Sequence, residues 1–175
     1  MTELERAIDR AADSDRSVLI WDDDPVERRT IAATIHERSA RRTKPFLSVP
    51  CDSPEHFEGR VLGHERAPLA GAPDPRPGIL EMAHGGTVFV DDVAMLGLLD
   101  QWILYSASER GLIYRLGAAT PVKVDVRYVF ATGADLGPLV TAGKFRKDLF
   151  GELCRSAICV PPTRDFALPE PPGTM

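Results

Sequence analysis

The chain has 175 residues, 43% of them hydrophobic and 27% charged, which is typical of one folded domain. Its 21 Lys and Arg against 26 Asp and Glu give a formal charge of −5, which argues against general binding to nucleic acid or to an anionic membrane. No apolar run approaches the roughly 18 residues of a membrane span, and the charged N-terminus does not resemble a signal peptide. The 3 cysteines form no CxxC pair, so we expect reduced thiols in a cytoplasmic protein.

The first third of the chain alternates between helical and strand patterns. Residues 3–14 have apolar side chains at helical spacing and predict a short amphipathic helix. Residues 17–21 form an apolar run typical of a buried strand. Asp24 is a favourable N-cap and Pro25 suits the first helical position, so a helix is predicted over 25–38.

The same alternation continues through the middle of the chain. A second strand is predicted at 46–49 and a third at 87–90. Prolines and glycines predict a loop without regular structure over 67–78. A short helical piece is expected at 79–84 and a longer helix at about 96–110, with Trp102 in the core.

A fourth strand is predicted over 123–132 and a fifth at 157–160. Strands that alternate with helices predict an α/β fold with a central, mainly parallel five-stranded sheet. We expect one domain over 1–165, beginning with the helix at 1–14, and a Pro-rich disordered tail over 166–175.

Acidic residues follow two of the predicted strands. Asp22, Asp23 and Asp24 come after the first strand, and Asp91 and Asp92 after the third. Ligands bind at the carboxyl ends of parallel strands, and carboxylates are suitable ligands for Mg²⁺. Asp91 is therefore a weak metal candidate, although helix caps and solvated loop ends would explain the same residues.

Five longer stretches carry a family resemblance: GHERAPLAGA (63–72), GILEMAHGGTVFVDDV (78–93), VKVDVRYVFATGADL (122–136), GKFRKDLFGEL (143–153) and VPPTRD (160–165). In order and spacing they resemble the ATPase domain of sigma-54-dependent transcription activators, the bacterial enhancer-binding proteins of the AAA+ group. The resemblance implies a P-loop-derived three-layer sandwich, which in intact members binds ATP and Mg²⁺.

The phosphate-binding loop departs from the family pattern. The family carries a Walker A sequence, roughly G-E-x-G-x-G-K-E, whose backbone N–H groups and lysine hold phosphates. The vestigial loop here consists of Asp22, Asp23, Asp24, Pro25, Glu27 and Arg28. All three glycines are absent, Pro25 lacks an N–H donor, and Arg28 stands at the lysine position. We therefore expect no nucleotide cofactor.

The residues at the family's catalytic positions also differ from the family pattern. Asp91 matches the Walker B aspartate that holds Mg²⁺, whereas Asp92 stands where the family has the glutamate that activates water. Pro50 replaces the asparagine that positions this glutamate, and Gly133 replaces the sensor asparagine.

In the family, two arginine residues act on the nucleotide of a neighbouring subunit, and only one of them has a match here. Arg146 matches one of two arginine fingers, and Glu152 reverses the charge of the second. We therefore treat Asp91, Asp92 and Arg146 as vestigial catalytic residues and expect no hydrolysis.

The family's partner loop, GAFTGA, has lost its aromatic ring and its threonine hydroxyl. The aligned residues are Ala67, Pro68, Leu69, Ala70, Gly71 and Ala72. This puts contact with sigma-54 RNA polymerase in doubt. The chain also stops where the family's helical lid begins, so we expect neither a lid nor direct DNA binding.

A second, shorter resemblance covers only residues 17–35, which look like the start of a response-regulator receiver domain. A receiver would need its phosphorylated aspartate about 40–45 residues further on, but residues 63–68 read GHERAP. A receiver-like acidic pocket is therefore a minor alternative.

Together these features predict a nucleotide-independent regulatory or protein-binding module in bacterial signalling or transcription regulation. The expected partner is another AAA+ activator or a second copy, through a surface around Arg146 and residues 111–117, with no membrane contact. The main alternative is a divergent but active domain that binds ATP and Mg²⁺.

Overall fold

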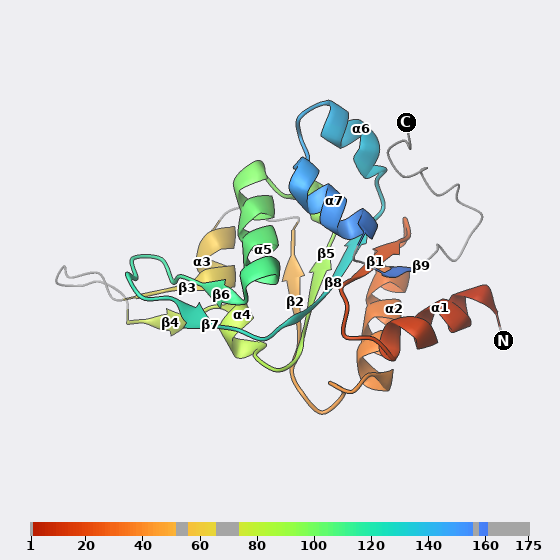
Figure 1. The fold of residues 1–175 in the computed structure, drawn as a ribbon, viewed down its shortest axis with the longest axis horizontal. Coiled ribbons are helices and arrows are strands. Elements are labelled where there is room, and N and C mark those ends of the chain that lie inside the picture. Colours follow the sequence, from red (N-terminus) through yellow and green to blue (C-terminus); the bar gives the residue numbers. More distant parts are fainter. Residues whose placement is uncertain (1, 52–55, 66–73, 156–157, 161–175) are drawn as a thin grey trace.

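A computed structural model describes residues 2–51, 56–65, 74–155 and 158–160 (Figure 1). Its centre is a five-stranded sheet in which every pairing is parallel. In spatial order the strands are β2 (Phe46–Pro50), β5 (Thr87–Asp91), β8 (Arg127–Thr132), β1 (Val18–Trp21) and β9 (Ile158–Val160). The predicted α/β fold with a parallel five-stranded sheet is confirmed.

Helices cover both faces of this sheet, as a three-layer sandwich requires (Figure 1). On one face, α1 (Glu3–Ala12) and α2 (Pro25–Arg38) pack over Val18, Ile20 and Phe89. The opposite core contains the neighbouring strand residue Leu19 and lies under α3 (Phe57–Leu62), α5 (Leu98–Arg110) and α7 (Lys147–Arg155). Successive strand residues point to opposite faces, so the uninterrupted apolar strands fill two cores.

Smaller elements complete the described fold. These are α4 (Ile79–Met82), the 3-10 turn η1 (Val93–Met95), α6 (Leu136–Thr141) and two antiparallel ribbons, β3 (Gly63–His64) with β4 (Arg76–Pro77) and β6 (Leu112–Ile113) with β7 (Val122–Lys123). Among the described residues, no helix is both long and apolar enough to cross a lipid bilayer.

Two of the predicted boundaries were wrong. Residues 76–77 fall in the predicted loop 67–78 but pair with 63–64. The tight approach requires glycine at 63, because a Cβ there would lie 2.4 Å from the Arg76 carbonyl oxygen. The strand predicted over 123–132 begins only at Arg127, because Lys123 belongs to the separate ribbon with β6.

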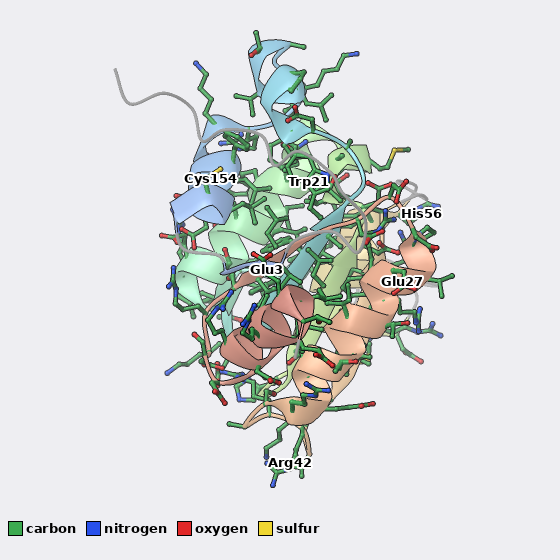
Figure 2. The ribbon with its side chains drawn as sticks, turned by 90° about the vertical axis from the view of Figure 1, so that its right-hand side faces the viewer. Glu3, Trp21, Glu27, Arg42, His56 and Cys154 are labelled. Carbon is green, nitrogen blue, oxygen red and sulfur yellow. The ribbon has the colours of Figure 1, made fainter. Side chains whose placement is uncertain are left out.

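One side chain expected in the core faces outward: Trp102 is 44% exposed on α5. Cys154 is also exposed, on α7 (Figure 2). The tail over 166–175 lies outside the described residues.

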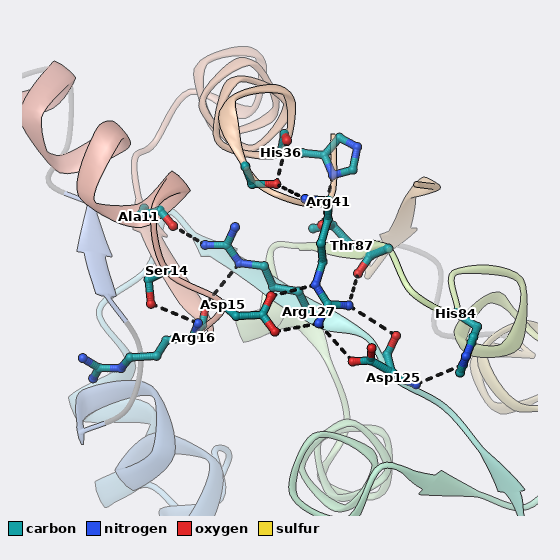
Figure 3. Close-up of polar contacts among 12 residues, drawn as sticks. Ala11, Ser14, Asp15, Arg16, His36, Arg41, His84, Thr87, Asp125 and Arg127 are labelled. Carbon is teal, nitrogen blue, oxygen red and sulfur yellow. Dashed lines mark hydrogen bonds and ion pairs between the residues drawn. The ribbon is translucent and has the colours of Figure 1, made fainter. Parts of the chain in front are cut away.

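A polar cluster joins the amino-terminal edge of the sheet to the segment after α1 (Figure 3). Arg41 donates two hydrogen bonds to the Asp15 carboxylate, at 2.7 and 2.6 Å, and one to Asp125 at 3.0 Å. The buried Arg127 donates to the carbonyl oxygens of Ala11 and Arg16. These contacts fix α1 and its following loop against the start of β8.

The Asp15 carboxylate gives this cluster a testable pH dependence. The hydrogen bond from Arg41 lowers the pKa of Asp15 below its usual 3.8. A depressed pKa contributes stability above the unfolded-state pKa, and that stability is lost as the pH falls. Asp15→Asn should therefore lower the free energy of unfolding at pH 7, and the difference from wild type should be smaller at about pH 3. Urea denaturation at both pH values measures this.

Asp13→Asn is the matched control, because Asp13 is an exposed carboxyl in the same loop and makes no ion pair with a described residue. It should change the unfolding free energy little at either pH. An equal loss for Asp15→Asn at both pH values would contradict the assignment.

Candidate functional site

The site lies at the carboxyl edge of the sheet, where the loop after β1 leads into α2. Asp24 is the N-cap of α2, and its Oδ1 accepts the Val26 N–H at 2.8 Å. Asp22 Oδ1 accepts the Asp24 N–H, also at 2.8 Å. Carboxylates of the chain itself therefore occupy backbone donors of the loop, in the segment where the family resemblance places a phosphate cradle.

Arg28 closes the same loop from inside. Its side chain is only 6% exposed, and its Nε donates to Asp91 Oδ1 at 2.9 Å. Its Nη1 donates to the Asp22 carbonyl oxygen at 3.0 Å. One guanidinium thus links the loop after β1, the first turns of α2 and the end of β5. The structure brings together three predicted site residues, Asp22, Arg28 and Asp91.

Gly133 leaves the space that this guanidinium needs. A Cβ at position 133 would lie 3.1 Å from Arg28 Nη1 and 3.3 Å from the Asp22 carbonyl oxygen. The Asp22 N–H donates to the carbonyl oxygen of Thr132 at 3.1 Å, which holds the loop against the end of β8. The family's asparagine at position 133 would therefore require Arg28 or the loop to shift.

The remaining loop residues face outward. Glu27 is exposed near the start of α2 (Figure 2). Pro25 is exposed as well. Asp23 is also exposed. Asp23 and Glu27 add negative charge to the loop, and Pro25 restricts its backbone.

Asp91 and Asp92 have different environments. The Asp91 side chain is 29% exposed and engaged by Arg28. Asp92 adopts a left-handed backbone with φ of 58°, and its carbonyl oxygen accepts the Met95 N–H. Among the residues described, no three His, Cys, Asp or Glu side chains form a group that could hold a metal ion.

Arg146 is held within its own chain. Its guanidinium makes two hydrogen bonds to the Asp148 carboxylate, at 2.9 and 2.6 Å, and lowers the pKa of Asp148. Its backbone N–H donates to Oε1 of the fully buried Gln101 at 2.8 Å. No described hydrogen bond or ion pair joins Arg146 to Arg28 or Asp91.

The partner loop over 67–72 lies outside the described residues, which end at residue 65 before it and resume at residue 74 after it. Arg115 donates to both Glu81 oxygens at 2.7 Å and to Glu65 at 2.9 Å. This clamp ties Glu65, two residues before the loop, to Glu81 on α4. It was missed in the sequence, because pairs 34 and 50 residues apart leave no local pattern.

Comparisons with known proteins agree with this fold. The family model described as "Sigma-54 interaction domain" matches residues 1–159. The anaerobic nitric oxide reductase transcription regulator NorR of Escherichia coli (strain SE11) is 38% identical over 94% of this chain and 33% of its own length. The DNA-binding transcriptional regulator NtrC of Azospirillum brasilense is 34% identical over 94% of this chain and 35% of its own. The chain thus spans about a third of these relatives.

A solved structure extends the likeness to three dimensions. NtrX from Brucella abortus in complex with ATP superimposes with a TM-score of 0.79 at 30% identity, covering 91% of this chain and 36% of NtrX. The P-loop NTPase domain of an E. coli sigma-54 activator, at 14% identity and a TM-score of 0.59, shares the fold.

The Arg28 contacts predict the effect of restoring a lysine. An ammonium group on a single stem cannot reproduce the guanidinium's two bonds in different directions. Arg28→Lys should therefore lower the free energy of unfolding by about 1–3 kcal/mol, since a buried partner is left unpaired. Chemical denaturation measures this. Arg29→Lys, at an exposed neighbouring position, should change it by less than about 0.5 kcal/mol. Equal stability of both variants would refute the importance of this contact.

Proposed function

Because the chain belongs to the sigma-54 interaction domain family, we propose that it is a nucleotide-independent regulatory or protein-binding member of it, in bacterial transcription regulation or signalling. The relatives include transcription regulators, and the fold is that of their P-loop domains. In this proposal the fold is retained as a scaffold for protein contacts, and its phosphate loop no longer takes a nucleotide.

The observation that carries the proposal is the ion pair of Arg28 with Asp91 at 2.9 Å. In the family the Walker A lysine faces phosphate and the Walker B aspartate holds Mg²⁺. Here the two corresponding side chains bind each other. A nucleotide that entered would have to break this pair and the bond from Arg28 to the Asp22 carbonyl oxygen. Separating a pair at a largely buried site leaves uncompensated charge.

The charge of the loop opposes nucleotide binding further. Asp22, Asp23 and Asp24 are consecutive, and a carboxylate about 5 Å from a phosphate costs about 3 kcal/mol at an effective dielectric constant near 20. Asp22 and Asp24 also accept N–H groups that a phosphate would otherwise use. Both effects weaken the binding of a triphosphate.

The residues at the family's catalytic positions also support a nucleotide-independent function. Gly133 offers no amide where the resemblance implies a sensor asparagine, and a larger side chain would crowd Arg28. Arg146 is paired with Asp148 and would have to release it before acting on a neighbour. In the comparison, NtrX is the protein solved with ATP, and this chain differs from the family motif at the loop itself.

In this proposal the domain acts through surfaces that bind other proteins. The Arg115 clamp joins Glu65, two residues before the partner-loop sequence at 67–72, to Glu81 on α4. The partner we propose is another AAA+ activator or a second copy of this chain. We propose no direct contact with DNA, and contact with sigma-54 RNA polymerase stays in doubt.

Isothermal titration with Mg²⁺ and ATP tests the proposal. The wild-type chain should give no binding heat at about 1 mM ATP, which corresponds to a binding free energy weaker than about −4 kcal/mol. The quadruple variant Asp22→Gly, Pro25→Gly, Glu27→Gly, Arg28→Lys should gain at least about tenfold in affinity, because it restores backbone donors and removes two carboxylates.

The matched control is Asp13→Asn with Glu37→Gln, which removes two exposed carboxylates away from the loop. It should remain without binding heat. Micromolar binding of ATP by the wild-type chain would overturn the proposal and favour a divergent, active ATPase.

A further inference from the structure

A pocket of about 280 Å³ lies at the amino-terminal edge of the sheet, opposite to the edge that holds the candidate site. It is lined by residues 12–15 at the end of α1, by residues 39–41 after α2 and by Arg127, the first residue of β8. Its base includes the buried Arg127, whereas Asp13 and Ala40 are exposed at its mouth. The volume is at the lower end of the range for ligand pockets, so the pocket suits a small metabolite.

Arg127 is a buried cation whose guanidinium is only partly satisfied. Its Nε and Nη2 donate to the carbonyl oxygens of Arg16 and Ala11 (Figure 3). Its Nη1 is buried and has no hydrogen-bond partner among the described residues. No ion pair joins this guanidinium to a carboxylate in the described part of the chain. A buried donor without a partner is costly, so Nη1 requires an acceptor from outside the described chain.

The nearby carboxylate of Asp15 does not meet this need. Both of its oxygens accept hydrogen bonds from Arg41. Burial lowers the pKa of Arg127, and the charge of Asp15 offsets this effect only in part. The guanidinium of Arg127 is therefore charged, desolvated and short of one anionic acceptor.

Two further polar side chains of the lining remain available to a ligand. Ser14 Oγ accepts the Arg16 N–H at 3.2 Å and keeps a hydroxyl hydrogen that it can donate. Asp13 is an exposed carboxylate that makes no ion pair with a described residue. The pocket thus offers two unused donors, on Arg127 and Ser14, and one unused carboxylate.

We propose that this pocket binds a small zwitterion of the free amino acid class. The carboxylate of the ligand accepts hydrogen bonds from Arg127 Nη1 and Ser14 Oγ, because charge-assisted bonds from arginine to carboxylate are among the strongest available. The ammonium group of the ligand lies beside the Asp13 carboxylate. Each side chain that lacks a partner within the described pocket then gains one of opposite charge or matching hydrogen-bonding type.

The acidic mouth of the pocket favours this class over other ligands. Asp13 and Asp15 both line the pocket, so a phosphate with two negative charges meets repulsion there. A water molecule satisfies Nη1 of Arg127 but leaves the guanidinium charge and the Asp13 carboxylate without counter-charges. An amino acid has no net charge and supplies both. It contacts the segments after α1 and α2 and the start of β8 together, so only the folded chain binds it.

Thermal unfolding of the full chain with a panel of the common amino acids, each at about 10 mM, tests the proposal. At least one amino acid should raise the Tm by about 3 °C or more, because a ligand that binds only the folded state stabilises it. Acetate and methylammonium at the same concentration should each raise the Tm by less than about 1 °C, since each supplies only one of the two charges. Isothermal titration with the most effective amino acid then gives its Kd.

Substitutions in the lining locate the bound amino acid. Asp13→Asn and Ser14→Ala should each raise its Kd about threefold or more, because one loses the counter-charge of the ammonium group and the other loses a donor. Arg127→Lys should raise the Kd at least about tenfold, since an ammonium group cannot replace Nη1. Glu37→Gln is the matched control: it removes an exposed carboxylate outside the pocket and should leave the Kd within about twofold. Circular dichroism verifies that each variant is folded.

The variants of Asp13 and Ser14 keep the test decisive if Arg127→Lys does not fold. The proposal is overturned if no amino acid in the panel raises the Tm, or if acetate or methylammonium alone is as effective as the best amino acid. An unchanged Kd in the folded Asp13→Asn and Ser14→Ala variants overturns it as well. The probes contain no phosphate, so these outcomes are separate from those of the ATP titration.

Discussion

The ion pair between Arg28 and Asp91 is the contact on which the candidate site depends. It joins the first turns of α2 to the end of β5, and the bond from Arg28 to the Asp22 carbonyl oxygen adds the loop after β1. The guanidinium is almost completely buried, so its charge needs both partners. The absence of a side chain at Gly133 follows from the same contact, because a Cβ would press on the guanidinium. The loop, the strand end and the glycine form one mutually dependent arrangement.

Local signals in the sequence predicted much of the fold. Asp24 and Pro25 set the start of α2, and the predicted range 25–38 matches the helix. The rule that parallel strands present their carboxyl ends at one edge placed Asp22 and Asp91 near each other, as found. Local patterns could not predict the direction in which the Arg28 side chain points. A lysine-position residue is expected to face a ligand, and only the folded structure shows it turned onto Asp91.

The exposed Trp102 shows a second limit of sequence patterns. The neighbouring Gln101 is fully buried, because its amide satisfies the Leu96 and Lys144 carbonyl oxygens and the Arg146 N–H. Residue type alone would predict a buried Trp102 and an exposed Gln101, since a large ring is usually buried and an amide usually exposed. The amide is buried because three backbone groups need it, and two of them, on Lys144 and Arg146, are distant from Gln101 in the sequence. That need appears only when the loop before α7 reaches α5.

An internal cation differs from a bound cofactor in one thermodynamic respect. Arg28 is covalently part of the chain, so its local concentration beside Asp91 is fixed, and it is neither hydrolysed nor diluted. Under the proposed function, the geometry that Arg28 maintains is insensitive to the energy charge of the cell. The proposed module would then present one constitutive surface, and its output would follow its own abundance and that of its binding partners rather than a metabolic cycle.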